Sequence, residues 1–235
     1  MRIDKVLSNL KYCSRKEAKK FAKEGLITVN GEVIKDVSKH IDPTKDALKI
    51  GHQTITYYDT LTLMMNKRKG VVSANHDDLH PTVFEDLPTD YQRFDLNIAG
   101  RLDLDTEGLI VLSTDGKLIH DIISPSKSVY KTYEVFTDKP VDDIEKLKEP
   151  MSIEDGKGVL YTPATPIIRS QNKQRSVIQI KEGKFHQVKR MYAYLGYEVI
   201  ALKRIAIGNL LLDETLKPGM VKVLEEDDIN ALKNL

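Results

Sequence analysis

The chain has 235 residues, of which 40% are apolar and 30% are charged, and its formal net charge is +1. This composition is typical of a globular protein with a buried core and excludes bulk disorder. The single cysteine, Cys13, excludes an intrachain disulfide, a cysteine-rich zinc site and a CxxC redox pair. No apolar run reaches the ~18 residues of a membrane-spanning helix, and the amino terminus is too polar for a signal peptide. We therefore expect a cytoplasmic protein without membrane contact.

The small net charge hides an uneven distribution. Residues 1–50 contain 12 Lys or Arg against 7 Asp or Glu, whereas the rest of the chain is mildly acidic. A basic amino-terminal segment indicates contact with an anionic partner, although an ordinary solvated surface can show the same pattern.

Two short helices are predicted at the amino terminus. Apolar residues spaced i, i+3, i+4 and i+7 indicate one helix over residues 3–10. Ser14 and Glu17 form a capping-box pattern at the start of a second helix, which Gly25 ends. Lysines recur on one face of this second helix, namely Lys16, Lys19, Lys20 and Lys23. Like charges at this spacing repel each other, so the pattern is easier to explain if a polyanion neutralises it.

A tight β-hairpin is predicted next. The Asn30-Gly31 pair stands between two β-branched runs within residues 27–34, and both turn residues accept positive φ. The two helices and this hairpin resemble the small RNA-binding module first seen in ribosomal protein S-four. The resemblance implies that this region contacts RNA through Arg2, Arg15, Lys16, Lys19, Lys20, Lys23 and Asn30.

The remainder of the chain predicts an α+β domain. Residues 51–60 are polar and tyrosine-bearing, which favours a linker, so we place an S-four-like domain with its linker at 1–59 and a second domain at 60–235. Strands are predicted over residues 61–66, 109–113, 130–136, 177–180 and 199–207. Helices are predicted over residues 141–147, 186–195 and 227–232. Because there is no βαβ periodicity, we expect a mostly antiparallel mixed sheet.

Several familiar sites are absent from the sequence. It contains no GxxxxGK[ST] phosphate loop, no GxGxxG, no HExxH and no GxSxG. His76 and His80 have a spacing that suits a metal on a helix, but their surroundings indicate a loop and no third ligand is evident. We therefore expect no metal site.

A candidate catalytic carboxylate lies in residues 100–116. Asp103 follows Arg101-Leu102 in a turn just before an apolar strand, and Asp115-Gly116 favours a second turn after that strand. A loop supported by a rigid strand is a common mount for a catalytic group, yet an ordinary loop with a surface aspartate fits the residues equally well.

Family motifs distinguish these two interpretations. Gly-Arg-Leu-Asp-x-x-Thr-x-Gly-Leu at residues 100–109 resembles the signature of the ribosomal RNA pseudouridine synthases, with the small-subunit enzymes as the nearest group. Further motifs occur in the family's order at residues 66–70, 80–83, 131–133 and 182–191. At residue 68 the family has a proline in place of Arg68. The resemblance covers essentially the whole chain and implies a pseudouridine synthase domain behind the RNA-binding module.

The resemblance also implies the chemistry. Pseudouridylation breaks the uridine glycosidic bond and rejoins the base through its carbon 5, so it needs neither a redox cofactor nor ATP. Asp103 corresponds to the family's catalytic aspartate, Lys189 to its ion-pair partner and Tyr133 to the residue that stacks on the base. The resemblance leaves open whether the carboxylate attacks the sugar or removes a sugar proton. Contacts to RNA are expected from Lys67, Arg101, Lys131, His186, Gln187 and Arg190, and Arg190 is the second candidate for the ion pair.

Alternatives remain at this stage. The expected substrate is small-subunit 16S ribosomal RNA, either naked or as an assembly intermediate, and the alternative is large-subunit 23S ribosomal RNA. A non-catalytic assembly factor would explain the basic segment but not Asp103 and Tyr133. A hydrolase would use Asp103 and Asp105 as a carboxylate pair and would release free uracil. We expect a monomer.

Overall fold

The computed structural model describes residues 1–233, which form two compact units. Unit 1 comprises Met1–Thr60 together with Thr89–Phe94, and unit 2 comprises Leu61–Pro88 and the described chain from Asp95 onward. A short segment from the middle of the chain therefore belongs to the amino-terminal unit.

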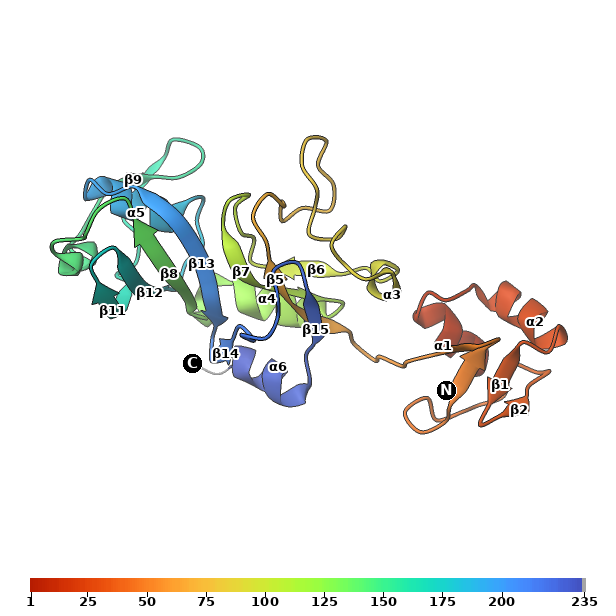
Figure 1. The fold of residues 1–235 in the computed structure, drawn as a ribbon. Helices are drawn as coiled ribbons and strands as arrows, with labels where there is room; N and C mark the ends of the chain where they lie inside the picture. The colour runs from red at the N-terminus through yellow and green to blue at the C-terminus, as the bar shows by residue number, and fades with distance from the viewer. Residues whose placement is uncertain (234–235) are drawn as a thin grey trace. The chain divides into compact units, whose positions relative to one another are not determined.

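Unit 1 packs two helices against a small antiparallel sheet (Figure 1). The helices are α1 (Ile3–Asn9) and α2 (Arg15–Lys23). The sheet has the order β2-β1-β3-β4, formed by Glu32–Val33, Ile27–Val29, Leu48–Ile50 and Gln53–Thr54. The apolar face predicted for residues 3–10 is buried in this core.

The segment from mid-chain is anchored to unit 1 through Arg93. It contains α3 (Thr89–Gln92). The Nε of Arg93 donates to the carbonyl of Leu10 at 2.9 Å, and its guanidinium lies 4.0 Å from the centroid of the Tyr12 ring. Phe94 packs edge-on against Tyr58, so the segment is an integral part of this core.

Local signals in unit 1 are confirmed. The hydroxyl of Ser14 accepts from the backbone N–H of Glu17, whose carboxylate accepts from the N–H of Ser14, which completes the capping box. Asn30 and Gly31 both have positive φ, at 52° and 88°. The predicted linker at residues 51–60 is wrong in its first half, because β4 lies there and the apolar side chain of Ile55 is buried in the core.

Unit 2 is built on one large sheet. Its order is β11-β12-β8-β13-β7-β5-β15, with β14 on β13 and β6 on β7. Only β13 and β7 pair in parallel among the strands of the described chain, so the mostly antiparallel mixed sheet of an α+β fold is confirmed. The strands are β5 (Thr62–Lys67), β6 (Asn97–Ala99), β7 (Glu107–Ser113), β8 (Lys131–Thr137), β11 (Ile167–Asn172), β12 (Arg175–Ile180), β13 (Val199–Ile207), β14 (Leu210–Leu211) and β15 (Val221–Val223). A separate hairpin pairs β9 (Ile153–Glu154) with β10 (Leu160–Tyr161).

Helices cover this sheet in two places and create two apolar cores (Figure 1). One core lies between α5 (Gln187–Tyr194) and the half of the sheet that contains β8, β12 and β13. The other gathers α4 (Gly116–Ile123) and α6 (Glu226–Lys233) beside β6, β7 and β14. Two short 3₁₀ turns, η1 (Pro125–Lys127) and η2 (Ile144–Lys148), complete the unit.

Three expectations for unit 2 need correction. The predicted helix at 141–147 is the 3₁₀ turn η2, which stops at Glu149 because a residue before proline avoids helical ψ. Asp115-Gly116 is a helix start, since the Asp115 carboxylate accepts from the N–H groups of Lys117 and Leu118 and caps α4. The strands β11 and β15 were not predicted, because as edge strands they lack the apolar alternation of a half-buried strand.

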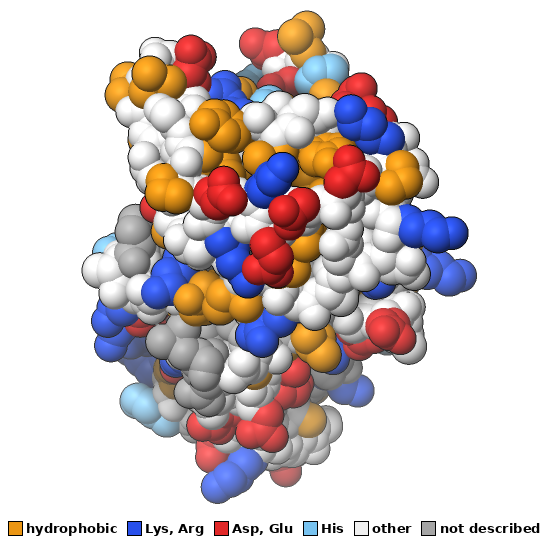
Figure 2. Space-filling model, turned by 90° about the vertical axis from the view of Figure 1, so that its left-hand side faces the viewer, with side chains coloured by type: hydrophobic (Ala, Val, Ile, Leu, Met, Phe, Trp, Pro, Cys, Tyr) orange, Lys and Arg blue, Asp and Glu red, His pale blue; other side chains and the backbone are white. Residues whose placement is uncertain are grey.

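The β11 end of the large sheet carries acidic and basic side chains interspersed with apolar ones (Figure 2). No helix in residues 1–233 is long and apolar enough to cross a membrane.

Candidate active site

Asp103 lies on the loop between β6 and β7, and a buried lysine donates hydrogen bonds to the backbone of that loop. The N–H of Thr106 donates to the carbonyl of Asp103 at 3.1 Å, which closes a β-turn. The Nζ of Lys67 donates to the carbonyls of Asp103 at 2.8 Å and Thr106 at 2.7 Å. Ser73 fixes the preceding residue by bonding both the N–H and the carbonyl of Leu102. The backbone around Asp103 is therefore set by the interior of the domain.

A buried arginine on β13 bonds the start of the same loop and the strand that follows it. Arg204 is 1% exposed, and its guanidinium donates to the carbonyls of Gly100 and Leu109, both at 2.7 Å. Gly108 has φ +105°, and a Cβ there would lie 2.2 Å from the carbonyl oxygen of Arg204. The motif glycine at 108 is thus required by the close approach of β7 to β13.

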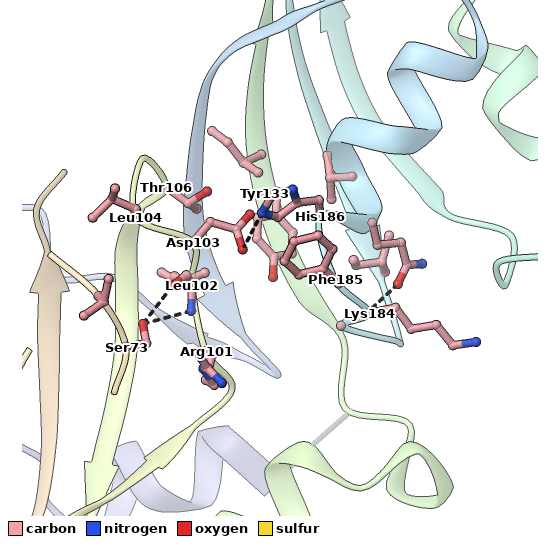
Figure 3. A pocket seen from close by; sticks show the side chains of 16 residues that line it. Ser73, Arg101, Leu102, Asp103, Leu104, Thr106, Tyr133, Lys184, Phe185 and His186 are labelled. Atoms are coloured by element: carbon pink, nitrogen blue, oxygen red, sulfur yellow. Dashed lines mark hydrogen bonds and ion pairs between the residues drawn. The ribbon is translucent and has the colours of Figure 1, made fainter. Parts of the chain in front are cut away.

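The side chain of Asp103 lines a cavity of about 530 Å³ (Figure 3). Arg101, Leu102 and Thr106 line it from the same loop, Tyr133 lines it from β8, and the segment 183–188 closes the opposite side. The Tyr133 side chain is 7% exposed. Carboxylate, aromatic ring and basic side chains thus surround one space that can hold an extruded base.

A lysine and a histidine side chain flank the Asp103 carboxylate. The Nζ of Lys189 lies 3.6 Å from Oδ2, and the Nε2 of His186 lies 3.5 Å from Oδ1. Lys189 is closer to Asp105, at 2.6 Å from Oδ1. Burial raises the pKa of the Asp105 carboxyl, but its hydrogen bond and ion pair with Lys189 outweigh that effect and leave the pKa below its usual value. Lys189 therefore bridges the two carboxylates of the motif.

His186 was predicted to contact RNA, and the structure places it beside Asp103. It caps α5 in the left-handed region at φ 52°, and its ring stacks on Phe185 with 3.7 Å between centroids. Phe185 lines the same cavity and is 52% exposed. Sequence reasoning did not identify Phe185 as a site residue, although its place in the 182–191 motif was an available signal.

Three residues predicted to contact RNA are buried; this corrects the prediction for Lys67 and Lys131, whereas Gln187 still lines the cavity. Lys67 donates to the loop carbonyls. The Nζ of Lys131 donates to the carbonyls of Ile122 and Lys181. Gln187 is 3% exposed and bonds the N–H of Lys184 and the carboxylate of Glu182. A buried polar group generally has a hydrogen-bond partner within the protein, and each of these three side chains has one.

Arg190 takes a different partner from the one considered for it. Its Nη1 donates to the carbonyls of Glu154 and of Asp155, so Arg190 holds the β9–β10 hairpin. It has no ion pair with Asp103 in the described chain. Arg101 is exposed at the rim of the cavity.

The other predicted RNA contacts lie in unit 1. Arg15 and the four lysines of α2 are exposed. Arg2 forms a two-pronged pair with the buried carboxylate of Asp4, and this hydrogen bond lowers the pKa of Asp4. The amide of Asn30 bonds Asp46 and the N–H of Ala47, so it holds the hairpin against β3. Arg2 and Asn30 thus have structural partners.

Comparisons with known proteins agree with this architecture. Residues 61–194 match the RNA pseudouridylate synthase family, and residues 1–46 match the S4 domain. An uncharacterized RNA pseudouridine synthase of Bacillus subtilis is 40% identical over 236 residues, covering 99% of this chain and 98% of that protein. Ribosomal small subunit pseudouridine synthase A of Escherichia coli is 34% identical, covering 99% of this chain and 100% of that protein. A crystal structure of a pseudouridylate synthase has a TM-score of 0.68 and 31% identity, with 99% of each chain covered.

An S4 domain joined to a domain that matches the RNA pseudouridylate synthase family defines an RNA-modifying enzyme. The chain belongs to the RNA pseudouridine synthase family, and the resemblance found in its motifs is confirmed. The reaction is the isomerisation of uridine to pseudouridine in RNA.

Proposed function

We propose that the protein converts a uridine of small-subunit ribosomal RNA to pseudouridine, with Asp103 as the catalytic carboxylate. The observation that carries the assignment of Asp103 is its position: a carboxylate in the cavity, flanked by Lys189 and His186. The ribosomal target is supported by relatives named ribosomal small subunit pseudouridine synthase A, which match 99% of this chain.

The reaction makes definite demands on the cavity. The bond between C1′ of the ribose and N1 of uracil breaks, the base turns, and a bond forms between C1′ and C5. The C5 proton is lost and N1 regains a proton, so the atoms balance without a co-reactant. The carboxylate of Asp103 acts in its ionised form, which the positive charge of Lys189 favours.

Tyr133 and the segment 183–188 provide the rest of the proposed site. Tyr133 presents an aromatic ring to the same cavity, and a base stacked on such a ring is held without regard to which edge faces the carboxylate. This property suits a base that has to turn during the reaction. Arg101, exposed at the rim, is placed to meet a phosphate of the target strand.

We further propose that the protein acts as a monomer in the cytoplasm, where ribosomes are assembled.

We also propose that unit 1 docks on RNA next to the target through Arg15 and the four lysines of α2. These charges are exposed. Phosphate contacts of this kind position a protein on RNA without selecting a base.

The test uses unmodified small-subunit ribosomal RNA, both naked and partly assembled with ribosomal proteins. Wild type is compared with Asp103→Asn, and pseudouridine is mapped by carbodiimide labelling and primer extension. We expect one new stop with wild type and a rate at least about 1000-fold lower with Asp103→Asn.

The matched control is Asp105→Asn, which removes a carboxylate two residues away that also pairs with Lys189. We expect this variant to keep the stop. A stop that persists in Asp103→Asn would refute the catalytic assignment, and a stop only on large-subunit RNA would move the target to that RNA.

A further inference from the structure

Thr106 carries a buried hydroxyl that has no partner. Its residue is 1% exposed, and within residues 1–233 its Oγ1 makes no hydrogen bond. The backbone of the same residue is fully engaged, because its N–H bonds Asp103 and its carbonyl accepts from Lys67. An unpaired buried hydroxyl costs stability, and a valine of the same shape would avoid that cost.

The Asp103 carboxylate, three residues earlier in the chain, has acceptor positions that could take a hydrogen bond from this hydroxyl. The side-chain oxygens of Asp103 accept no hydrogen bond from the described chain, since Lys189 and His186 lie at 3.6 Å and 3.5 Å. An ionised carboxylate has about four acceptor positions. Asp103 and Thr106 are the first and last residues of one β-turn and line one cavity. Figure 3 shows the hydroxyl of Thr106 on the side of its residue that faces Asp103.

We propose that Thr106 is a positioning residue whose hydroxyl donates a hydrogen bond to the Asp103 carboxylate in the RNA-bound enzyme. The inference rests on the proposed function of Asp103. In this proposal a nucleotide in the cavity displaces water from the carboxylate. The turn holds the backbone of both residues, and rotation of their side chains brings the hydroxyl to the carboxylate. The Thr106 hydroxyl then orients the Asp103 carboxylate, and each group gains the hydrogen-bond partner that it lacks in the free protein.

The experiment compares Thr106→Val and Thr106→Ser with wild type. Ribosomal RNA labelled with tritium at C5 of uridine reports the reaction directly, because C5 loses its proton to water. Single-turnover rates are measured over a range of enzyme concentrations, which separates the maximal rate from RNA binding. Thermal melting of each full-length variant reports stability.

We expect Thr106→Val to lose reaction rate without losing stability. The maximal rate falls by about 10- to 100-fold, the enzyme concentration at half-maximal rate changes little, and the melting temperature stays equal to or rises above that of wild type. Thr106→Ser keeps the hydroxyl and should recover the rate to within about threefold of wild type.

The matched control is Thr62→Val. Thr62 is equally buried, but its hydroxyl pairs with Ser113 at 2.8 Å. Removing a hydrogen bond that is already made should lower the melting temperature and leave the rate unchanged, which is the reverse of the pattern expected at Thr106.

Other outcomes would overturn the positioning role of Thr106. A wild-type rate in Thr106→Val, a fall in its melting temperature, or a serine variant as slow as the valine variant would overturn the positioning role. Asp103→Asn is measured alongside. If wild type releases tritium and Asp103→Asn does not, a failure at Thr106 concerns this inference alone. If wild type releases none from either ribosomal RNA, the proposed function falls and this inference with it.

Discussion

The lysines of α2 in unit 1 and three buried basic side chains of unit 2 have opposite surroundings. On α2, Lys16, Lys19, Lys20 and Lys23 are exposed, and only Lys20 approaches an acid in the described chain, at 3.9 Å from Glu24. In unit 2, Lys67, Lys131 and Arg204 are buried and donate hydrogen bonds to backbone carbonyls.

This contrast shows that a basic residue in an RNA-binding protein need not meet RNA. The exposed lysines of α2 keep their charge available for phosphates, whereas the buried cations satisfy carbonyls that loops and strand ends would leave unpaired. The backbone around Asp103 thus depends on the buried side chains of Lys67 and Arg204.

Among substitutions that test this contrast, replacing Lys67 should have the largest effect on stability and rate. Lys67→Met removes the side-chain donor of the buried Thr106 carbonyl and one of the two donors of the Asp103 carbonyl, which should lower the free energy of unfolding by about 3 kcal/mol. The rate of pseudouridine formation should fall at least about 100-fold, because the loop that carries Asp103 loosens. Urea unfolding and the tritium assay measure the two effects.

Lys16→Met is the matched control on the exposed side of the contrast. It should change the free energy of unfolding by no more than about 0.5 kcal/mol, as is usual for an exposed helical position. Equal losses of stability in Lys16→Met and Lys67→Met would show that burial does not separate the two groups of cations.

The pH dependence of stability should show a smaller effect. Burial, with the charge of Arg204 as a second cause, lowers the pKa of Lys131 to about 8. Between pH 8 and 10.5 the unfolded chain holds a proton on Lys131 that the folded chain has lost, so the free energy of unfolding rises with pH in that window. The gain over Lys131→Met should reach about 2 to 3 kcal/mol by pH 10.5.

Urea unfolding of wild type and Lys131→Met at pH 7, 8, 9 and 10 tests this expectation. The difference between the two proteins cancels the other groups that titrate in the same range. Parallel curves across these pH values would mean that Lys131 has an ordinary pKa and is not part of the buried group.

Changing the exposed lysines should affect binding alone. Replacing Lys16, Lys19, Lys20 and Lys23 by Gln should weaken RNA binding at low salt by about 30-fold and reduce the slope of log affinity against log salt by up to about 3. The melting temperature should not fall. Filter binding at several salt concentrations measures the slope.

A second quadruple variant controls for net charge. Lys139, Lys146, Lys148 and Lys173 are exposed in unit 2, and none lines the cavity. Replacing these four by Gln changes the net charge equally. If both variants lose the same slope, RNA responds to total charge and the position of the lysines on α2 is irrelevant.

Much of the architecture could be predicted from the sequence because its signals are local. The Ser14 capping box, the Asn30-Gly31 turn and the apolar runs of the central strands are determined by neighbouring residues. Edge strands such as β11 were missed because their exposed faces leave no periodic pattern. The short 3₁₀ turn η2 was taken for a helix because a few apolar residues cannot distinguish the two.

The site was predicted less completely, because burial arises from contacts distant in sequence. The motifs located Asp103, Tyr133 and the segment 183–188, which line one cavity. They could not reveal that Lys67 and Lys131 face inward, since a lysine in a motif has the same identity whether it binds a carbonyl or a phosphate. The short distance from Lys189 to Asp105 and the role of Arg204 also required the assembled sheet.

The anchoring of residues 89–94 in unit 1 affects how this protein matures on the ribosome. Translation proceeds from the amino terminus, so the core of the first unit stays incomplete until Arg93 and Phe94 have emerged, by which time β5 of the second unit has already been made. The two units are therefore interleaved during synthesis. A gene fusion or truncation that ends at residue 60 would separate Tyr12 and Tyr58 from the partners that complete their packing.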